Sequence, residues 1–156
     1  MPHENARYFK SLKILHIMLL AGQCLFLAVM VFLVTVRPVK MLDASFDKIL
    51  QVVALLLSFG GVFAATNIFK KRLQAIDTNA ATMAEIGTQY RAANIFRWAM
   101  IEGPSLFAVI CFFLTGNYAF AALAVALILF FALSGPSRLK AMIQLRLSEQ
   151  EVDQLQ

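Results

Sequence analysis

One acidic residue lies inside a long apolar run of this chain, and its side chain has the clearest potential for chemistry. The run is Ile95–Asn117, IFRWAMIEGPSLFAVICFFLTGN, and the acidic residue is Glu102. The long apolar runs contain no other Asp or Glu. A carboxylate in such a run is costly to bury unless it is protonated, paired or hydrated. Glu102 is therefore a candidate proton or cation site.

Few other polar side chains of the apolar runs are able to assist Glu102. They are Gln23 in the first run, Thr66 and Asn67 in the second, and Ser105 one turn beyond Glu102. With Glu102, these four residues form the candidate ion or proton site. The alternative interpretation is that Glu102 is protonated or hydrogen-bonded and only holds helices together.

Glycine, alanine and proline near these polar residues indicate close helix packing. Small residues four positions apart allow two helices to approach closely in a membrane. Proline has no N–H, so Pro104 leaves the Met100 carbonyl without its usual helix partner and predicts a kink beside Glu102. The predicted helix-packing residues are Gly60, Gly61, Ala64, Ala65, Gly103 and Pro104.

The composition indicates lipid rather than water as the surrounding solvent. The chain of 156 residues is 60% hydrophobic and 15% charged, whereas soluble domains are about 45–50% apolar and about 25% charged. Several apolar runs are long enough for a helix to cross a bilayer. We expect an all-α protein with one membrane domain, folded as an up-down bundle of four transmembrane helices. The predicted spans are residues 14–36, 49–69, 95–114 and 118–134.

The connections between the spans also carry patterns. Residues 37–48 are a polar link. In residues 70–94, apolar side chains recur with the helical period, which predicts a cytoplasmic helical hairpin with its turn near Asp77–Ala80. Gly116 can take the left-handed conformation that ends a helix, so a tight link is expected before the fourth span.

The C-terminal part predicts two short helices. Residues 137–147 combine basic and apolar positions in the pattern of a helix that lies along a membrane surface. Its expected apolar face consists of Leu139, Met142, Ile143 and Leu147. Ser148 and Glu151 have the spacing of a capping box, which predicts a last helix over residues 149–156.

The basic residues favour one orientation in the membrane. Eleven of the fourteen Lys and Arg residues lie in the N-terminal head, in residues 70–97 or in the C-terminal tail. Basic residues accumulate on the cytoplasmic side of membrane proteins. The pattern predicts a multi-pass protein of the bacterial inner, or cytoplasmic, membrane with both termini in the cytoplasm. Topology also explains the net charge of +5, so we expect no nucleic acid partner.

Two resemblances carry expectations about function. The Gly60-Gly61 run, the basic turn after it and the Glu102 run resemble the hairpin of the rotor ring (c) subunit of F- and V-type ATPases. This resemblance implies that Glu102 is an ion carrier, although the dense glycine repeat of the ring's inner helix is absent here. The whole chain resembles the uncharacterised four-span membrane proteins of Bacteroidetes-type bacteria, and that resemblance implies no activity.

Motifs of enzymes and of metal sites are not found. The sequence has no G-x-S-x-G, Walker or dinucleotide-binding motif. Cys24 and Cys111 are not placed for a disulfide framework or a metal cluster. His16 lacks a second ligand at suitable spacing and is expected to be a snorkelling residue at the membrane interface. We therefore expect no enzyme activity, no cofactor and no metal.

Two functions follow from these patterns. The first is a non-enzymatic structural or accessory subunit in the lipid bilayer. It would act through helix–helix contacts in a homo-oligomer or with other membrane subunits. The alternative is a proton- or cation-coupled carrier or channel that uses Glu102.

Overall fold

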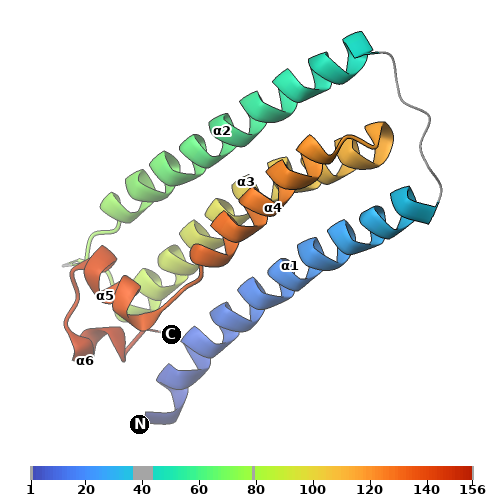
Figure 1. The fold of residues 1–156 in the computed structure, drawn as a ribbon. Coiled ribbons are helices and arrows are strands. Elements are labelled where there is room, and N and C mark those ends of the chain that lie inside the picture. The colour runs from blue at the N-terminus through green and yellow to red at the C-terminus, as the bar shows by residue number, and fades with distance from the viewer. Residues whose placement is uncertain (1, 37–43, 79, 156) are drawn as a thin grey trace.

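The computed structural model describes residues 2–36, 44–78 and 80–155. These residues form helices joined by turns, and none of them is in a strand, which confirms the predicted all-α class (Figure 1). The helices are α1 (Pro2–Val36), α2 (Ala44–Gln74), α3 (Met83–Thr115), α4 (Tyr118–Leu133), α5 (Arg138–Leu145) and α6 (Glu149–Val152).

Three of the described helices, α1, α2 and α3, are long and apolar enough to cross a membrane. Each contains one predicted span and extends beyond it. The helix α4 has 16 residues and is therefore only about 24 Å long. It meets the same criteria only together with α5, from which it is separated by a bend of 77°. Of the predicted link 37–48, residues 37–43 lie outside the described residues, and the remainder belongs to α2.

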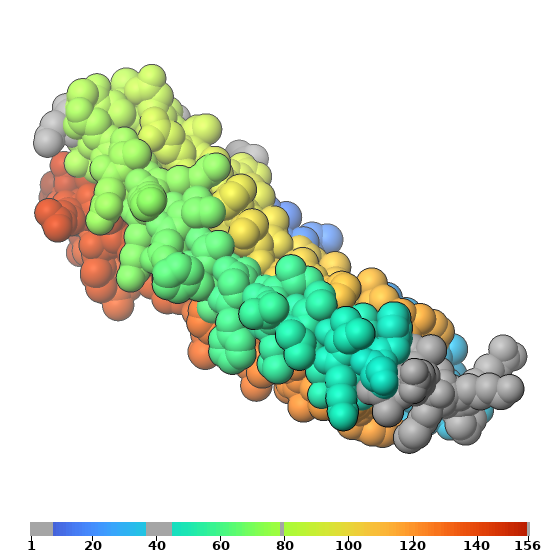
Figure 2. Space-filling view, turned by 90° about the horizontal axis from the view of Figure 1, so that it is seen from above, coloured from blue at the N-terminus to red at the C-terminus, as the bar shows by residue number. Residues whose placement is uncertain are grey.

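The helix α3 is the centre of the bundle. It packs against α1, α2 and α4, while α1 and α2 lie on opposite sides of the α3–α4 pair (Figure 1). The molecule is elongated, and α2 extends along the face seen in Figure 2. The helix α2 approaches α3 closely at Gly61. A Cβ atom on Gly61 would lie 2.7 Å from Pro104 Cγ, so only glycine allows this contact without a shift.

Local signals in the sequence explain where the helices begin and end. The side chains and backbones of Thr82 and Glu85 form a capping box at the start of α3. The same helix ends at Gly116, which has φ 67° and ψ 7°, the left-handed conformation expected of it. Asn117 then caps the start of α4 by accepting a hydrogen bond from the Ala119 N–H. The link between α3 and α4 is therefore only two residues long.

One end of the bundle has a hydrophobic core of its own. We call it the α5–α6 end: α1 up to His16, α3 up to Trp98, the α2–α3 turn, α5, α6 and the residues after α6. Both ends of the chain lie here (Figure 1). Its buried apolar side chains include Tyr8, Leu12, Ile76, Ile86, Tyr90, Ala141, Leu145, Leu147, Val152 and Leu155. The two short helices are thus packed on the bundle.

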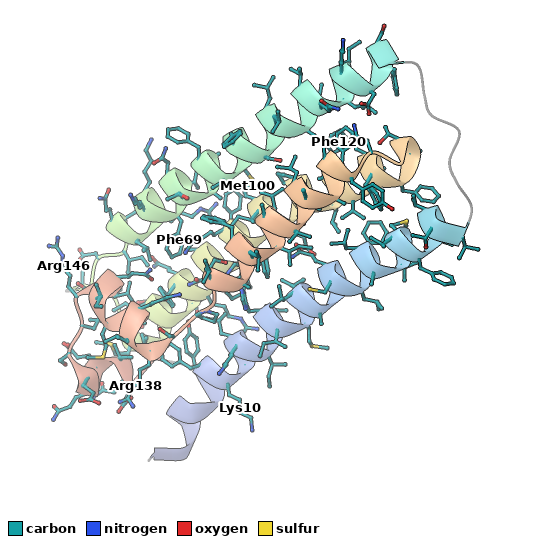
Figure 3. All side chains as sticks on the ribbon, in the orientation of Figure 1. Lys10, Phe69, Met100, Phe120, Arg138 and Arg146 are labelled. Carbon is teal, nitrogen blue, oxygen red and sulfur yellow. The ribbon has the colours of Figure 1, made fainter. Side chains whose placement is uncertain are left out.

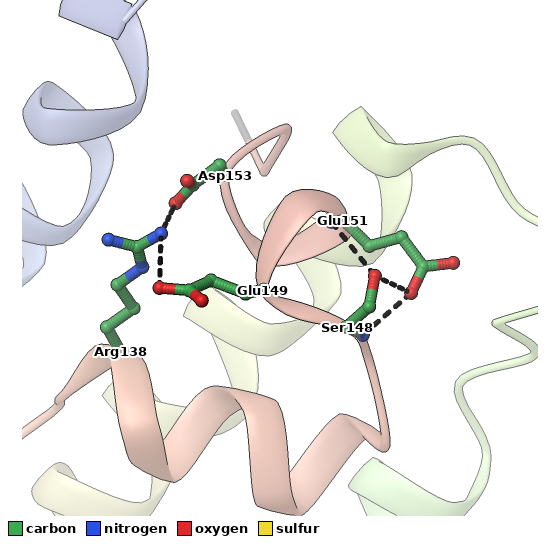
Figure 4. A network of polar contacts seen from close by, with 5 residues as sticks. All are labelled: Arg138, Ser148, Glu149, Glu151 and Asp153. Atoms are coloured by element: carbon green, nitrogen blue, oxygen red, sulfur yellow. Dashed lines mark hydrogen bonds and ion pairs between the residues drawn. The ribbon is translucent and has the colours of Figure 1, made fainter.

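The C-terminal helices differ in two respects from the expectation. In α5, Leu139 and Ile143 are exposed, whereas Leu147 is buried with Ala141 and Leu145, so the apolar residues lie on two faces rather than on one. The predicted helix 149–156 ends at Val152. It begins with the predicted capping box of Ser148 and Glu151. Beside it, Arg138 forms ion pairs with Glu149 and Asp153 (Figure 4).

Candidate functional site

Glu102 lies on α3 and is partly exposed. Met100 and Pro104, two residues before and after it, are the residues that approach Gly61 of α2. Two helical residues correspond to a rotation of about 200°. Glu102 is therefore on the side of α3 that faces away from α2. It forms no hydrogen bond or ion pair with another described residue.

Thr66 and Asn67 do not join Glu102. Both belong to α2 and are partly buried, whereas Glu102 faces away from that helix. The Thr66 hydroxyl donates a hydrogen bond of 2.8 Å to the Val62 carbonyl of its own helix. The structure thus separates these two residues from the carboxylate, whereas Gln23 and Ser105 are on the other side of α3.

Gln23 on α1 and Ser105 on α3 are both buried, with 1% and 0% of their surfaces exposed. Both amide atoms of Gln23 and the hydroxyl of Ser105 lack a hydrogen-bond partner among the described residues. Most buried polar atoms in proteins have such a partner, and a missing one costs about 1–3 kcal/mol. Two unpaired side chains from different helices therefore mark a polar site inside the bundle.

The contact between His16 and Trp98 shows where Gln23 and Ser105 lie along the axes of α1 and α3. The rings of His16 and Trp98 are 4.9 Å apart, and α1 and α3 run in the same direction (Figure 1). Gln23 is seven residues after His16, and Ser105 is seven residues after Trp98. Seven residues are almost two full turns of a helix. Gln23 and Ser105 therefore lie at the same level, on the facing sides of α1 and α3.

His16 does not snorkel at an interface as expected. It is 4% exposed and stacks on the ring of Phe131, with 4.7 Å between the ring centroids. Its Nε2 lies 3.0 Å from the Phe131 carbonyl oxygen. Because a carbonyl oxygen only accepts, Nε2 carries the proton. The Trp98 indole donates in the same way to the Ser134 carbonyl, over 3.3 Å.

The sequence does not predict this junction, because residues far apart in the chain form it. His16 and Trp98 donate to carbonyl groups at the end of α4, where helix carbonyls lack partners within the helix. Gly135 completes the contact, since a Cβ atom there would lie 3.2 Å from His16 Cε1. The break at Ser134-Gly135-Pro136 was the only signal in this part of the sequence.

The six predicted helix-packing residues have different environments. Gly61 contacts Pro104, and Ala65 is fully buried. The Met100 carbonyl oxygen would lie 3.2 Å from a Cβ atom on Gly61, so the carbonyl released by the proline is next to α2 and not beside Glu102. At Gly60 and Gly103, a Cβ atom would have no neighbouring atom within 4 Å. Ala64 is partly buried.

Arg97 adds a charge at the border between the polar site and the α5–α6 end. Its guanidinium lies 4.9 Å from the ring centroid of Phe69, a cation–π contact. Its Nε is buried and has no hydrogen-bond partner among the described residues. Arg97 is partly buried and lies on the side of α3 that contacts α2, whereas Ser105 lies on the side that faces Gln23 of α1.

No metal site is found in the part of the chain that the structure describes, since no three His, Cys, Asp or Glu residues are grouped there. Both cysteines are free; Cys24 is exposed and Cys111 is buried. The site that remains is a buried pair, Gln23 and Ser105, with a partly exposed carboxylate nearby on the same side of α3. Comparisons with known protein families, with curated proteins and with solved structures found no match.

Proposed function

We propose that the chain is an integral protein of the bacterial inner membrane that crosses the bilayer four times. In this proposal α1, α2, α3 and α4 are the spans, and the short α4 ends where α5 turns along the surface. The distribution of Lys and Arg supports a cytoplasmic location of both termini. In agreement with this, the α5–α6 end contains both ends of the chain (Figure 1).

Reporter fusions test the orientation. A fusion after Ala80, in the α2–α3 turn, is expected to report the cytoplasm. A fusion after Asn117, in the α3–α4 link, is expected to report the opposite side. Both positions are exposed or partly exposed. The reverse pattern would invert the orientation, and the same compartment for both would contradict α3 as a span.

Within the membrane, the chain acts as a non-enzymatic subunit through helix–helix contacts, either with copies of itself or with other membrane subunits. The observation that carries this proposal is the outer face of α2. Gly60 lies there with no atom within 4 Å of its Cβ position, between Phe59 and Phe63, which are 74% and 71% exposed. A glycine between large side chains leaves a shallow depression in which a second helix backbone can pack.

The test is the mass of the purified assembly. Gly60→Leu is expected to fill the depression and to shift the protein to a smaller assembly, as measured by light scattering in mild detergent. The matched control is Gly22→Leu on α1, where a Cβ atom would also meet nothing, and its mass is expected to be that of the parent. An unchanged mass for Gly60→Leu would remove the support for an α2 interface.

The second candidate function is proton or cation transfer, and the unpaired side chains of Gln23 and Ser105 favour it. Ser105 is three residues after Glu102 on α3, so its side chain is rotated by only about 60° from the carboxylate. Water between these groups would satisfy the unpaired atoms, and a cation could bind to Gln23 Oε1 and the Ser105 hydroxyl oxygen. Transfer then requires a carboxylate that takes up and releases a proton or cation, which Glu102 provides.

Carbodiimide labelling and one substitution test this second function. A carrier carboxyl is expected to react with the reagent and to be protected at high pH. Glu102→Gln is expected to assemble normally but to lose proton flux in reconstituted vesicles. If Glu102→Gln vesicles conduct like those of the parent, Glu102 is not the carrier and the helix-contact function remains.

A further inference from the structure

A cleft of about 550 Å³ lies between the end of α2 and α5, at the α5–α6 end. One wall comes from α2 and the turn after it, and the other from the last residues of α5 and its cap. The lining residues are Lys70, Leu73, Gln74, Ile76, Thr78, Ile143, Gln144, Leu145 and Arg146. No acidic residue is among them, so the charged side chains that line this cleft are all positive.

The two cationic side chains of the cleft, Lys70 and Arg146, are not neutralised by an ion pair with a described carboxylate. Neither Lys70 nor Arg146 forms an ion pair with a described carboxylate; the described ion pairs belong to Arg138. Arg146 projects from the end of α5 (Figure 3). The nearest acidic residue in sequence to the α2 wall is Asp77, whose Oδ1 accepts a hydrogen bond from the Ala80 N–H. The cleft therefore has two positive charges from elements 76 residues apart in sequence.

Arg146 has an unusual backbone. With φ 55° and ψ 36°, it is the only non-glycine residue with positive φ in the described parts of the chain. Helices usually place Gly or Asn at a left-handed cap, because a Cβ atom is disfavoured there. Strained non-glycine residues of this kind concentrate at ligand sites. An arginine at this strained position is explained if its side chain contributes to a binding site.

Gln144 is oriented by a hydrogen bond from another helix. The Tyr90 hydroxyl donates to Gln144 Oε1 over 3.0 Å. This contact occupies the acceptor oxygen of the amide and identifies the other amide atom as Nε2, which carries two N–H groups. Gln144 lines the cleft, where its free N–H donors add to those of Lys70 and Arg146.

From these observations we infer that the cleft between α2 and α5 binds a phosphate group. A phosphate offers several acceptor oxygens and negative charge, and arginine and lysine are its usual partners. Leu73, Ile76 and Ile143 provide an apolar surface beside the charges, which suits the glycerol and first acyl carbons of a phospholipid. The inference does not depend on assembly through α2 or on ion transfer by Glu102.

Lipid binding to the full-length protein in neutral detergent tests the inference, with native mass spectrometry as the readout. The probes are phosphatidylglycerol, phosphatidylcholine, which carries a cation on its phosphate, and inorganic phosphate. Phosphatidylglycerol is expected to bind saturably and phosphatidylcholine at least about tenfold more weakly, as a lost charge-assisted contact implies. Displacement of the lipid by millimolar inorganic phosphate would identify free phosphate as the ligand source. No displacement would identify the lipid headgroup.

Substitutions assign the binding to the cleft. Lys70→Gln and Arg146→Gln are each expected to weaken phosphatidylglycerol binding about tenfold. Lys71→Gln is the matched control, because Lys71 is the next residue of α2 and does not line the cleft; it is expected to change binding less than about twofold. Arg146→Gly is expected to weaken binding while the melting temperature stays equal or rises, since glycine accepts the left-handed backbone.

Three results would overturn the inference. The first is equal binding of phosphatidylglycerol and phosphatidylcholine. The second is the same loss of affinity for Lys71→Gln as for Lys70→Gln, which would show a general charge effect. The third is unchanged binding by Arg146→Gly.

Discussion

Polar side chains find their hydrogen-bond partners differently in the two halves of the bundle. At the α5–α6 end, polar side chains reach partners from other elements. The Tyr8 hydroxyl donates to the Gly87 carbonyl over 2.7 Å, and Tyr90 donates to Gln144. In the shaft, by which we mean residues 17–36, 45–69, 99–115 and 118–133, serine and threonine side chains mostly bond within their own helices. Ser58 donates to the Ala54 carbonyl, for example.

The packing of the two halves differs as well. The most apolar stretches of α1 and α2 are only 11% and 17% buried, so most of their large side chains point away from the protein. The α5–α6 end instead encloses aromatic and aliphatic side chains from four helices, the α2–α3 turn and the chain end. Such a core is stable in water, whereas the exposed faces of the shaft require lipid or another helix. The comparison predicts that removing a buried side chain of the α5–α6 end costs more free energy of unfolding than removing an exposed one of the shaft.

Of the substitutions that test this comparison, Trp98→Ala is expected to have the largest effect on the free energy of unfolding. Trp98 is completely buried, contacts His16 and donates to Ser134. Removing such a side chain costs about 3–5 kcal/mol. Phe63→Ala in the shaft is the matched control, because its ring is exposed and its loss is expected to cost less than about 0.5 kcal/mol. Chemical denaturation in mild detergent measures both, and equal losses would show that the two halves are equally important.

Gly61→Val is expected to have the next largest effect. A Cβ atom at this position lies too close to Pro104 Cγ and to the Met100 carbonyl, so α2 must move away from α3. Overpacking of this kind costs about 1–3 kcal/mol. Gly22→Val, at an open position, supplies the control for introducing valine into a helix. A stable Gly61→Val variant with an intact α2–α3 crosslinking pattern would contradict the contact.

Gln23→Leu is expected to change stability in the opposite direction. Both polar atoms of Gln23 are buried without a partner among the described residues, and replacing an unsatisfied group by an apolar one of similar size removes a cost of about 1–3 kcal/mol. The variant should therefore unfold at higher denaturant concentration than the parent. Gln144→Leu is the comparison at the α5–α6 end, where the amide is hydrogen-bonded to Tyr90, and it should destabilise. A destabilised Gln23→Leu variant would indicate that water or an ion satisfies Gln23.

The smallest expected effect is a pH dependence of α6. Hydrogen bonds from the Ser148 hydroxyl and then from its backbone N–H lower the pKa of Glu151. Because the folded pKa lies below the unfolded one, the stabilisation is complete above the unfolded pKa and is lost as the pH falls through the folded pKa. The protection factors of the α6 amides, which correct for the intrinsic pH dependence of hydrogen exchange, should therefore fall in acid. Ser148→Ala should weaken this dependence, since only the backbone N–H of residue 148 still donates to Glu151, and an unchanged profile in that variant would exclude the Ser148 hydroxyl as its main cause.

Features determined by neighbouring residues could be predicted from the sequence. The apolar runs indicate the three long helices, Gly116 indicates the end of α3, and Ser148 with Glu151 indicates the start of α6. Each depends on contacts within a few residues, so the pattern is sufficient. The same reasoning identified Gln23 and Ser105 as polar residues in apolar surroundings, although it did not show that they lie at one level.

Features determined by distant residues could not be predicted. Gly60 and Gly61 are adjacent, and only the position of Pro104 on α3 decides that Gly61 faces inward. The burial of His16 requires Trp98, Phe131 and Gly135, which are brought together by the bundle. One apolar face of α5 is buried because Ala141 and Leu145 join the core that contains Tyr90 of α3, to which Gln144 is hydrogen-bonded. In each case the deciding contact joins residues more than 35 positions apart.

The central position of α3 has a consequence for the synthesis of this protein. If α1 and α2 enter the bilayer first, each is there without its principal partner until α3 leaves the ribosome. During that interval Gln23 has only lipid around it, and Gly61 lacks its contact with Pro104. Insertion of α3 then assembles the bundle in one step, because α1, α2 and α4 all pack on it. Ribosomes stalled before and after residue 115 should therefore carry nascent chains that differ sharply in their resistance to protease and to detergent extraction.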